Sequence, residues 1–268
     1  MSVQTLYNAA TGMQSMETKL DVIANNLANV ATVGFKKDRA NFEDNFYRNE
    51  MLPGSVDSGG GMTAIGIHIG MGSRVSGVQS NFVQGAFEQT DDPYDVAIEG
   101  NGFFQVQDPG SGQTLYTRAG NFSINAEGRL VAGSASTGRP LEPPIDIPPD
   151  AMDVTIAPSG EVMVRQPGQT SFQQVGQIEL ARFINPEGLL KMGENLYAPT
   201  DASGQALNGP PQLDGRGQLR QGNLEASNVE PVRELIDLIT TQRSFEMNSQ
   251  AIKAGDQMLE LVSNLRRF

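Results

Sequence analysis

The residue types that most often carry enzyme chemistry are scarce in this chain. His68 is the only histidine, and there is no cysteine. A catalytic triad or a histidine-based metal site would depend on that one imidazole, which is more simply a packed or exposed loop residue. Thiolate nucleophiles, disulfides and Cys-based zinc sites are excluded. We expect no catalytic residue, no metal and no cofactor, and we expect the protein not to be an enzyme.

Two further patterns resemble functional motifs only at first sight. Asp91 and Asp92 stand directly before Pro93, which favours a turn over a general acid and base pair. The Gly-Asn-Gly stretch at 100–102 is too short for a phosphate-binding loop and lacks that motif's helix and lysine. A carboxylate-dependent hydrolase on a β-scaffold therefore has only the surplus of acidic residues in its favour.

The net charge excludes another class of function. Lys plus Arg total 19 and Asp plus Glu total 31, which gives a formal net charge of −12. Because that sign repels phosphate groups, neither nucleic acid nor an anionic membrane is an expected partner. The sequence has no run of about 18 apolar residues, the length that a helix needs to span a bilayer. Met1–Ala10 lacks the basic and apolar regions of a secretory signal, so we expect no membrane insertion and no cleaved signal peptide.

The elements that would position any functional residue follow from the distribution of glycine and proline. The 30 glycines and 15 prolines lie mostly between residues 53 and 222, and both ends are nearly free of them. This asymmetry predicts helical termini around a turn-rich β centre.

The N-terminal end shows a seam of apolar residues in alternating steps of three and four. Polar residues occupy the positions between them, as in a helix that packs on other helices. Gly34 supplies a left-handed stop, so we expect a helix over residues 1–34. The seam, which we expect to be a polymerisation interface, consists of Leu6, Ala9, Met13, Met16, Leu20, Ile23, Leu27 and Val30.

A second long helix is expected over residues 228–268. Ser227 or Asn228 can cap its start, and Pro231 falls in its first turn. Polar residues at 242, 249 and 256 weaken one seam position and leave the packing register open. The residues that recur once per heptad complete the expected interface: Leu238, Phe245, Ile252 and Leu259.

Short alternating runs with turn signals fill the centre. Residues 154–164 and 122–130 read as hairpins, and we expect an antiparallel β-domain over residues 93–222. Residues 35–92 are expected to be an extended connector, because periodicity is weak from 47 to 76. The predicted fold class is α+β, with the terminal helices forming a coiled-coil-like pair.

The two terminal stripes need a cover. A helix of roughly 30 residues is about 45 Å long, which a small β-domain cannot match, and an isolated amphipathic helix is only marginally stable. The stripes therefore pair with each other, with neighbouring copies, or with both. Head-to-tail contacts that do not close would give a helical polymer; a private helical hairpin would instead give a monomeric binding module.

The end of the N-terminal helix carries two special features. Asn25, Asn26 and Asn29 are poor helix formers inside the predicted helix. They either make polar contacts between helices that fix register, or fray and cap the helix end. Gly34 and Phe35 act either as a hinge with an anchor, or as a stop signal with an ordinary buried ring.

Several blocks resemble the flagellar rod and hook proteins. They are LDVIANNLANVATVGFK at 20–36, DVAIEGNGFFQV at 95–106, YTRAGNFSINAEGRL at 116–130, GENLY at 193–197, and the stretch 221–259, in the order the family places them. The chain length and the segment 47–75 are similar to the distal rod subunits of this family. A proximal rod subunit is the alternative, because residues 59–61 and 65–68 match less closely.

The resemblance implies a structural subunit of the distal rod in the basal body, where copies form a helical tube across the periplasm. Such a tube transmits motor torque to the hook and encloses the export channel. The implied partners are further copies of the chain, neighbouring rod and hook subunits, the P-ring and L-ring proteins, and the flagellar type III export apparatus. Export through that apparatus agrees with the expected lack of a cleaved signal peptide.

Overall fold

The computed structural model describes residues 3–54, 64–134, 138–168 and 171–265. Its fold is α+β. The chain forms two compact units: a helical unit, made of residues 1–28, 38–79 and 230–268, and a β unit, made of residues 29–37 and 80–229. Residues 59–61, on which the distinction between rod subunits partly depended, lie outside the described residues.

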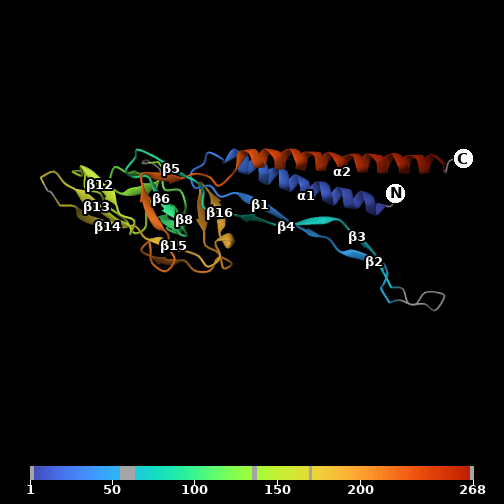
Figure 1. Cartoon of the computed structure of the whole chain (residues 1–268), viewed down its shortest axis with the longest axis horizontal. Helices are drawn as coiled ribbons and strands as arrows, with labels where there is room; N and C mark the ends of the chain where they lie inside the picture. Colours follow the sequence, from blue (N-terminus) through green and yellow to red (C-terminus); the bar gives the residue numbers. More distant parts are fainter. Residues whose placement is uncertain (1–2, 55–63, 135–137, 169–170, 266–268) are drawn as a thin grey trace. The chain divides into compact units, whose positions relative to one another are not determined.

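The helical unit contains the two long helices. Helix α1 spans Val3–Ala28 and helix α2 spans Pro231–Leu265, and the two lie side by side (Figure 1). Helix α1 ends at Ala28 and not near Gly34, where the sequence pattern placed its stop. The reason is a turn in which Thr32 N donates to Asn29 O at 3.2 Å and Thr32 Oγ1 donates to Asn29 Oδ1 at 3.1 Å.

Paired strands fill much of the expected connector. Strand β1 (Asp38–Asp44) pairs with β4 (Ser73–Ser80), and β2 (Tyr47–Met51) pairs antiparallel with β3 (Ile67–Gly70). The weak periodicity of this segment is explained by strands that are largely exposed, so that no buried face imposes an apolar alternation. The role of the segment as a connector stays a prediction.

Short strands build the β unit. The largest sheet has six strands in the order β16-β17-β8-β7-β15-β18, and two smaller sheets have three strands each. In sequence order the strands are β5 (Phe87–Gln89), β6 (Val96–Glu99), β7 (Phe103–Gln107), β8 (Thr114–Thr117), β9 (Phe122–Ile124), β10 (Leu130–Ala132), β11 (Arg139–Pro140), β12 (Asp153–Ile156), β13 (Glu161–Arg165), β14 (Gln173–Gln177), β15 (Leu180–Arg182), β16 (Leu190–Gly193), β17 (Leu196–Ala198), β18 (Leu207–Gly209), β19 (Gln218–Gln221) and β20 (Asn223–Glu225), with a 3-10 turn at Pro186–Gly188.

Both predicted hairpins are confirmed by the strand register. Val154 lies opposite Val164 in the antiparallel pair β12–β13. Ile124 lies opposite Leu130 in the antiparallel pair β9–β10. The turn residues therefore specified these local pairings correctly.

Two apolar clusters fill the interior of the β unit. The larger contains fully buried branched and aromatic side chains such as Ile98, Phe104 and Leu180. The smaller cluster contains aromatic rings from β7, β8, β17 and the segment between β15 and β16. The rings are in edge-to-face contact, with the Phe103 and Phe183 centroids 5.8 Å apart. The β unit thus closes its own hydrophobic core.

Candidate assembly site

The predicted seam faces the interior of the helical pair without being fully covered. On α1, Ala9 and Ile23 are buried, while Leu6, Met13, Met16, Leu20 and Leu27 are half-buried. Val30, also half-buried, lies in the turns after the helix. On α2, Leu238, Phe245 and Ile252 are half-buried, and Leu259 is exposed. The seam therefore retains apolar surface that the other helix of the same chain does not cover.

Two glycines bring α1 and α2 close together. A Cβ atom on Gly255 would lie 2.5 Å from Leu6 Cδ2, and one on Gly12 would lie 3.1 Å from Asn248 Nδ2. Such approaches leave little room for large interlocking side chains between the helices. Close packing in this pair therefore depends on small residues, which the heptad pattern alone did not indicate.

Asn26 joins three segments of the helical unit. Its side chain is 1% exposed. Its Oδ1 accepts from Asp38 N at 2.9 Å, and its Nδ2 donates to Asp38 O at 2.9 Å and to Glu234 Oε2 at 3.3 Å. Asn26 thus makes a polar contact between α1 and α2 within one chain. By contrast, Asn25 is exposed, and Asn29 lies in the turn after the helix.

A second apolar surface lies at the start of α2 and was missed by the sequence analysis. We call it the α2 row, consisting of Val232, Leu235, Ile236 and Ile239, which are 69%, 46%, 56% and 49% exposed. Their spacing of three and four residues places them along one side of the helix. The cluster of apolar residues at 235–239 was the available signal, because the seam takes one residue of each heptad and leaves the other apolar residues on a different face.

The segment after α1 is held firmly inside the β unit. Gly34 has φ +68°, and a Cβ there would lie 2.8 Å from Ala119 N and from Arg118 C. Gly34 N donates to Glu225 O at 2.7 Å, and Phe35 is buried with Lys191 Nζ 5.1 Å from its ring centre. The two expected hinge residues are therefore fixed at this point of the chain, where only glycine fits.

A buried charge cluster follows immediately. Lys36 Nζ lies 2.5 Å from Glu225 Oε1, and both side chains are fully buried. Glu225 Oε1 also accepts from Gly85 N at 2.9 Å, and Arg118 Nη1 lies 3.6 Å from Glu225 Oε2. Burial lowers the pKa of Lys36 and of Arg118 below their ordinary values, because both lose hydration. The cluster pins residues 36, 85, 118 and 225 to one another.

One asparagine ties together segments of the β unit that are far apart in sequence. Asn228 Oδ1 accepts from Lys37 N at 2.7 Å, and its Nδ2 donates to Asn81 O at 2.8 Å and to Val83 O at 2.9 Å. Each of these segments leads to a crossing between the two units of the chain. The β unit therefore holds three of the four chain crossings, those next to residues 37, 80 and 229, at a single set of hydrogen bonds.

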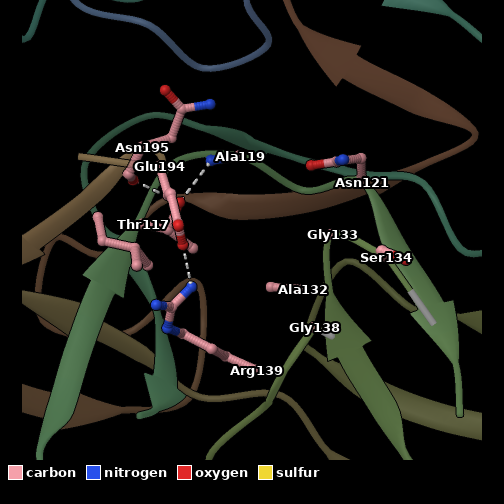
Figure 2. A pocket seen from close by; sticks show the side chains of 11 residues that line it. Thr117, Ala119, Asn121, Ala132, Gly133, Ser134, Gly138, Arg139, Glu194 and Asn195 are labelled. Atoms are coloured by element: carbon pink, nitrogen blue, oxygen red, sulfur yellow. Dashed lines mark hydrogen bonds and ion pairs between the residues drawn. The ribbon is translucent and has the colours of Figure 1, made fainter. Parts of the chain in front are cut away.

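A polar cavity of about 180 Å³ lies in the β unit. Figure 2 shows Arg139 pointing toward Glu194 among the residues that line it. Arg139 pairs with Glu194 and lies 3.4 Å from Asp108 Oδ1. The Asp108 pKa is held below its ordinary value, chiefly by hydrogen bonds from Ser111 and secondarily by Arg139. The guanidinium already has two carboxylate partners, so this cavity offers no unmet charge to a ligand.

The described residues contain no group of three or more His, Asp or Glu placed to hold a metal ion. Within the same part of the chain, neither helix is long and apolar enough to cross a membrane. His68, at the β2–β3 pair, contacts Asn49 with Nδ1 2.5 Å from Oδ1. The surfaces that most clearly leave apolar side chains uncovered are thus the seam and the α2 row.

Three family descriptions match the chain. Residues 6–36 match "Flagella basal body rod protein", residues 97–164 match "Flagellar hook protein FlgE/F/G D1 domain", and residues 220–265 match "Flagellar basal body rod FlgEFG protein C-terminal". These segments include most of α1, the centre of the β unit and all of α2.

Full-length relatives match as well. The flagellar basal-body rod protein FlgG of Caulobacter vibrioides is 44% identical and covers 98% of this chain and 100% of its own length. FlgG of Agrobacterium fabrum is 42% identical and covers 97% and 98%. The flagellar basal-body rod protein FlgF of Caulobacter vibrioides is 36% identical and covers 90% and 89%. Within that one organism, FlgG is the nearer relative.

Proposed function

The chain belongs to the FlgG family of flagellar basal-body rod proteins, as a structural subunit of the rod, and from this premise we propose that its copies join through their terminal helices into a helical tube. The observation that carries this proposal is the α2 row, four apolar side chains left exposed on one side of a helix. A contiguous exposed apolar surface marks an interaction site. Neighbouring copies are the proposed cover.

The seam has a part in the same proposal. Its half-buried residues, from Leu6 to Leu27 on α1 and from Leu238 to Ile252 on α2, hold the pair together and complete their burial against other copies, as does the exposed Leu259. A private helical hairpin alone would leave the α2 row in water, which disfavours the monomeric alternative. Exposed Asn25 is proposed to face a neighbouring helix, whereas Asn26 and Asn29 shape the subunit itself.

The proposed role in the basal body is mechanical, with no catalytic step. The tube assembles with other rod and hook subunits, forms the distal part of the rod, encloses the export channel and transmits torque. Gly34 and Phe35 are the proposed fixed end of a hinge, because the β unit holds them in place. We further propose contacts of the outer surface with the P-ring and L-ring proteins, and export through the flagellar type III apparatus.

Self-association of the purified chain tests the proposal. Ile236→Asp with Ile239→Asp places two charges in the α2 row, while Gln250→Asp adds a charge at an exposed polar position of the same helix. Polymer growth is followed by light scattering and negative-stain microscopy, and motility by complementation of a deletion strain. We expect the double variant to lose both and Gln250→Asp to retain both. Normal assembly of the double variant would contradict the proposal.

A further inference from the structure

A second cavity of about 180 Å³ in the β unit has a positive lining. Arg118 and Arg182 both line it, beside the aromatic rings of Phe82, Phe103 and Phe183. The chain as a whole carries a net charge of −12, so two guanidinium groups in one small cavity run against the overall charge. Such a pair is suited to an anionic group.

Arg118 has hydrogen-bonding capacity that the described residues leave unused. Its side chain is 3% exposed, and its Nη2 donates to Gly100 O at 2.7 Å. Among the described residues, neither its Nε nor its Nη1 has a hydrogen-bond partner. Buried donors are normally satisfied, and those of a cationic group most of all. Arg118 Nη1 faces Glu225 Oε2 at 3.6 Å, an oxygen that also lacks a hydrogen-bond partner among the described residues, so the donor without a nearby acceptor is Nε.

The charge cluster next to the cavity has one positive charge too many. Lys36 and Arg118 share the single carboxylate of Glu225, whose Oε1 lies 2.5 Å from Lys36 Nζ. Its Oε2 is 3.6 Å from Arg118 Nη1, beyond normal hydrogen-bond length. Glu225 therefore makes a short ion pair with Lys36 and only a longer ionic contact with Arg118. A second carboxylate near Arg118 would balance the cluster.

The aromatic rings that line the cavity lie beside the guanidinium group of Arg118. Arg118 Cζ lies 5.5 Å from the ring centre of Phe103, and Phe103 is itself in edge contact with Phe82 at 5.4 Å. A cation over an aromatic ring is stabilised electrostatically, and the planar N–H groups of a guanidinium match a planar carboxylate. Arg182 is exposed and donates Nη1 to Asp214 O at 2.7 Å, so its other N–H groups can complete the site.

We propose that this cavity, which we call the arginine pocket, binds a carboxylate group, and that in the assembled rod the carboxylate is an acidic side chain of a second copy of the chain. The identification of a second copy as the source of the carboxylate rests on the proposed function. Ile184, which lines the rim and is 81% exposed, offers apolar surface that suits a protein segment better than a free ion. A small carboxylate in solution is the other source of the same chemistry.

Binding of a minimal acidic side chain tests the pocket itself. The probe is N-acetylglutamate α-amide, and its neutral isostere, N-acetylglutamine α-amide, is the control ligand. NMR of the Arg118 Nε–Hε group in dilute full-length chain should shift with the charged probe only. Arg182→Gln should weaken binding by about tenfold, as expected for a lost charge-assisted hydrogen bond. Arg220→Gln, which removes an exposed arginine stacked on Phe87, should leave binding unchanged.

No shift with the charged probe, an equal shift with the neutral one, or equal weakening in both variants would overturn the pocket. Polymer growth then separates the two sources. If a second copy supplies the carboxylate, Arg182→Gln and the charged probe slow assembly, while Arg220→Gln and the neutral probe do not. Binding without any effect on assembly would assign the site to a small carboxylate and overturn the second-copy source. Failure of the unmodified chain to assemble would count against the proposed function and leave the binding result standing.

Discussion

The two units of the chain fill their interiors with different kinds of side chain. The β unit buries branched and aromatic residues completely, such as Ile98, Phe104 and Leu180. Among the described residues of the helical unit, the buried apolar side chains are only Ala9 and Ile23. The remaining buried positions described there are small or polar, namely Ser15, Asn26, Asp38, Glu234, Thr241 and Gly255.

This difference separates a structure that is complete in one chain from one that is not. Apolar burial supplies most of the stability of a domain, and the β unit has that contribution in full. Helix stability in proteins comes mainly from packing an apolar face, and the helical unit leaves much of its apolar surface in water. Copies of the chain can supply the missing cover, which is why we propose that the helical unit is the one that assembles.

The largest expected effect comes from the buried charges of the β unit. Glu225→Gln leaves Lys36 and Arg118 without their carboxylate, and breaking a buried ion pair costs about 3–5 kcal/mol. We expect cooperative unfolding of the β unit at clearly lower denaturant concentration, measured by near-ultraviolet circular dichroism. Glu127→Gln, at an exposed ion pair with Arg129, is the control and should change stability by less than about 1 kcal/mol. Equal midpoints for the two variants would show that the cluster does not stabilise this unit.

Gly34→Ala tests how tightly the first crossing is held. The added methyl group meets the backbone of residues 118 and 119 at 2.8 Å, and φ is +68°. We expect a loss of about 3 kcal/mol from clash and strain together. Gly112→Ala is a matched control, with the same φ of +68° and nothing within 4 Å, and should lose only about 1 kcal/mol. Similar losses in both variants would mean that backbone strain alone acts at Gly34.

Asn26→Ala probes the polar interior of the helical unit. It removes the side-chain hydrogen bonds to the N–H and C=O of Asp38, and the loss of such bonds at a buried site costs about 1–3 kcal/mol. We expect faster amide exchange in α1 and β1, with the β unit unchanged. The neighbouring exposed Asn25→Ala should alter stability by less than about 0.5 kcal/mol. Destabilisation of the β unit by Asn26→Ala would show that the contacts of Asn26 stabilise more than the helical unit.

The smallest effect on the single chain is expected in the α2 row. Ile236→Ser at an exposed position should change monomer stability by less than about 0.5 kcal/mol. Assembly should nevertheless weaken strongly, because the removed apolar surface is the one proposed to meet other copies. The ratio of the two effects is measured by denaturant unfolding and by critical concentration. A large loss of monomer stability would place Ile236 in the interior of its own subunit.

Residue patterns were most informative where structure is decided locally. Turn residues predicted the hairpins at 122–130 and 154–164, and the terminal stripes predicted both helices. The predicted end of α1 near Gly34 was wrong. The turn formed by Asn29 and Thr32 ends the helix although the apolar seam continues to Val30. Local hydrogen bonding of asparagine competes with the helix there.

Contacts between residues far apart in the chain could not be predicted from the sequence. Lys36 and Glu225 are 189 positions apart, and nothing in their local spacing indicates that they form a buried ion pair. The α2 row was missed for a related reason: a heptad pattern identifies one apolar face, and a helix with two such faces needs knowledge of which face its own chain covers. Strand pairing within 38–80 also depends on partners distant in sequence.

We propose that the terminal helices are completed by other copies of the chain. Hydrogen exchange of α1 and α2 amides, measured in the dilute chain and in the assembled polymer, tests this most directly. The account predicts that both helices exchange much faster than β7 and β15 in the dilute chain and reach comparable protection after assembly. Helices already as protected as those strands in the dilute chain, with no further change on assembly, would contradict it.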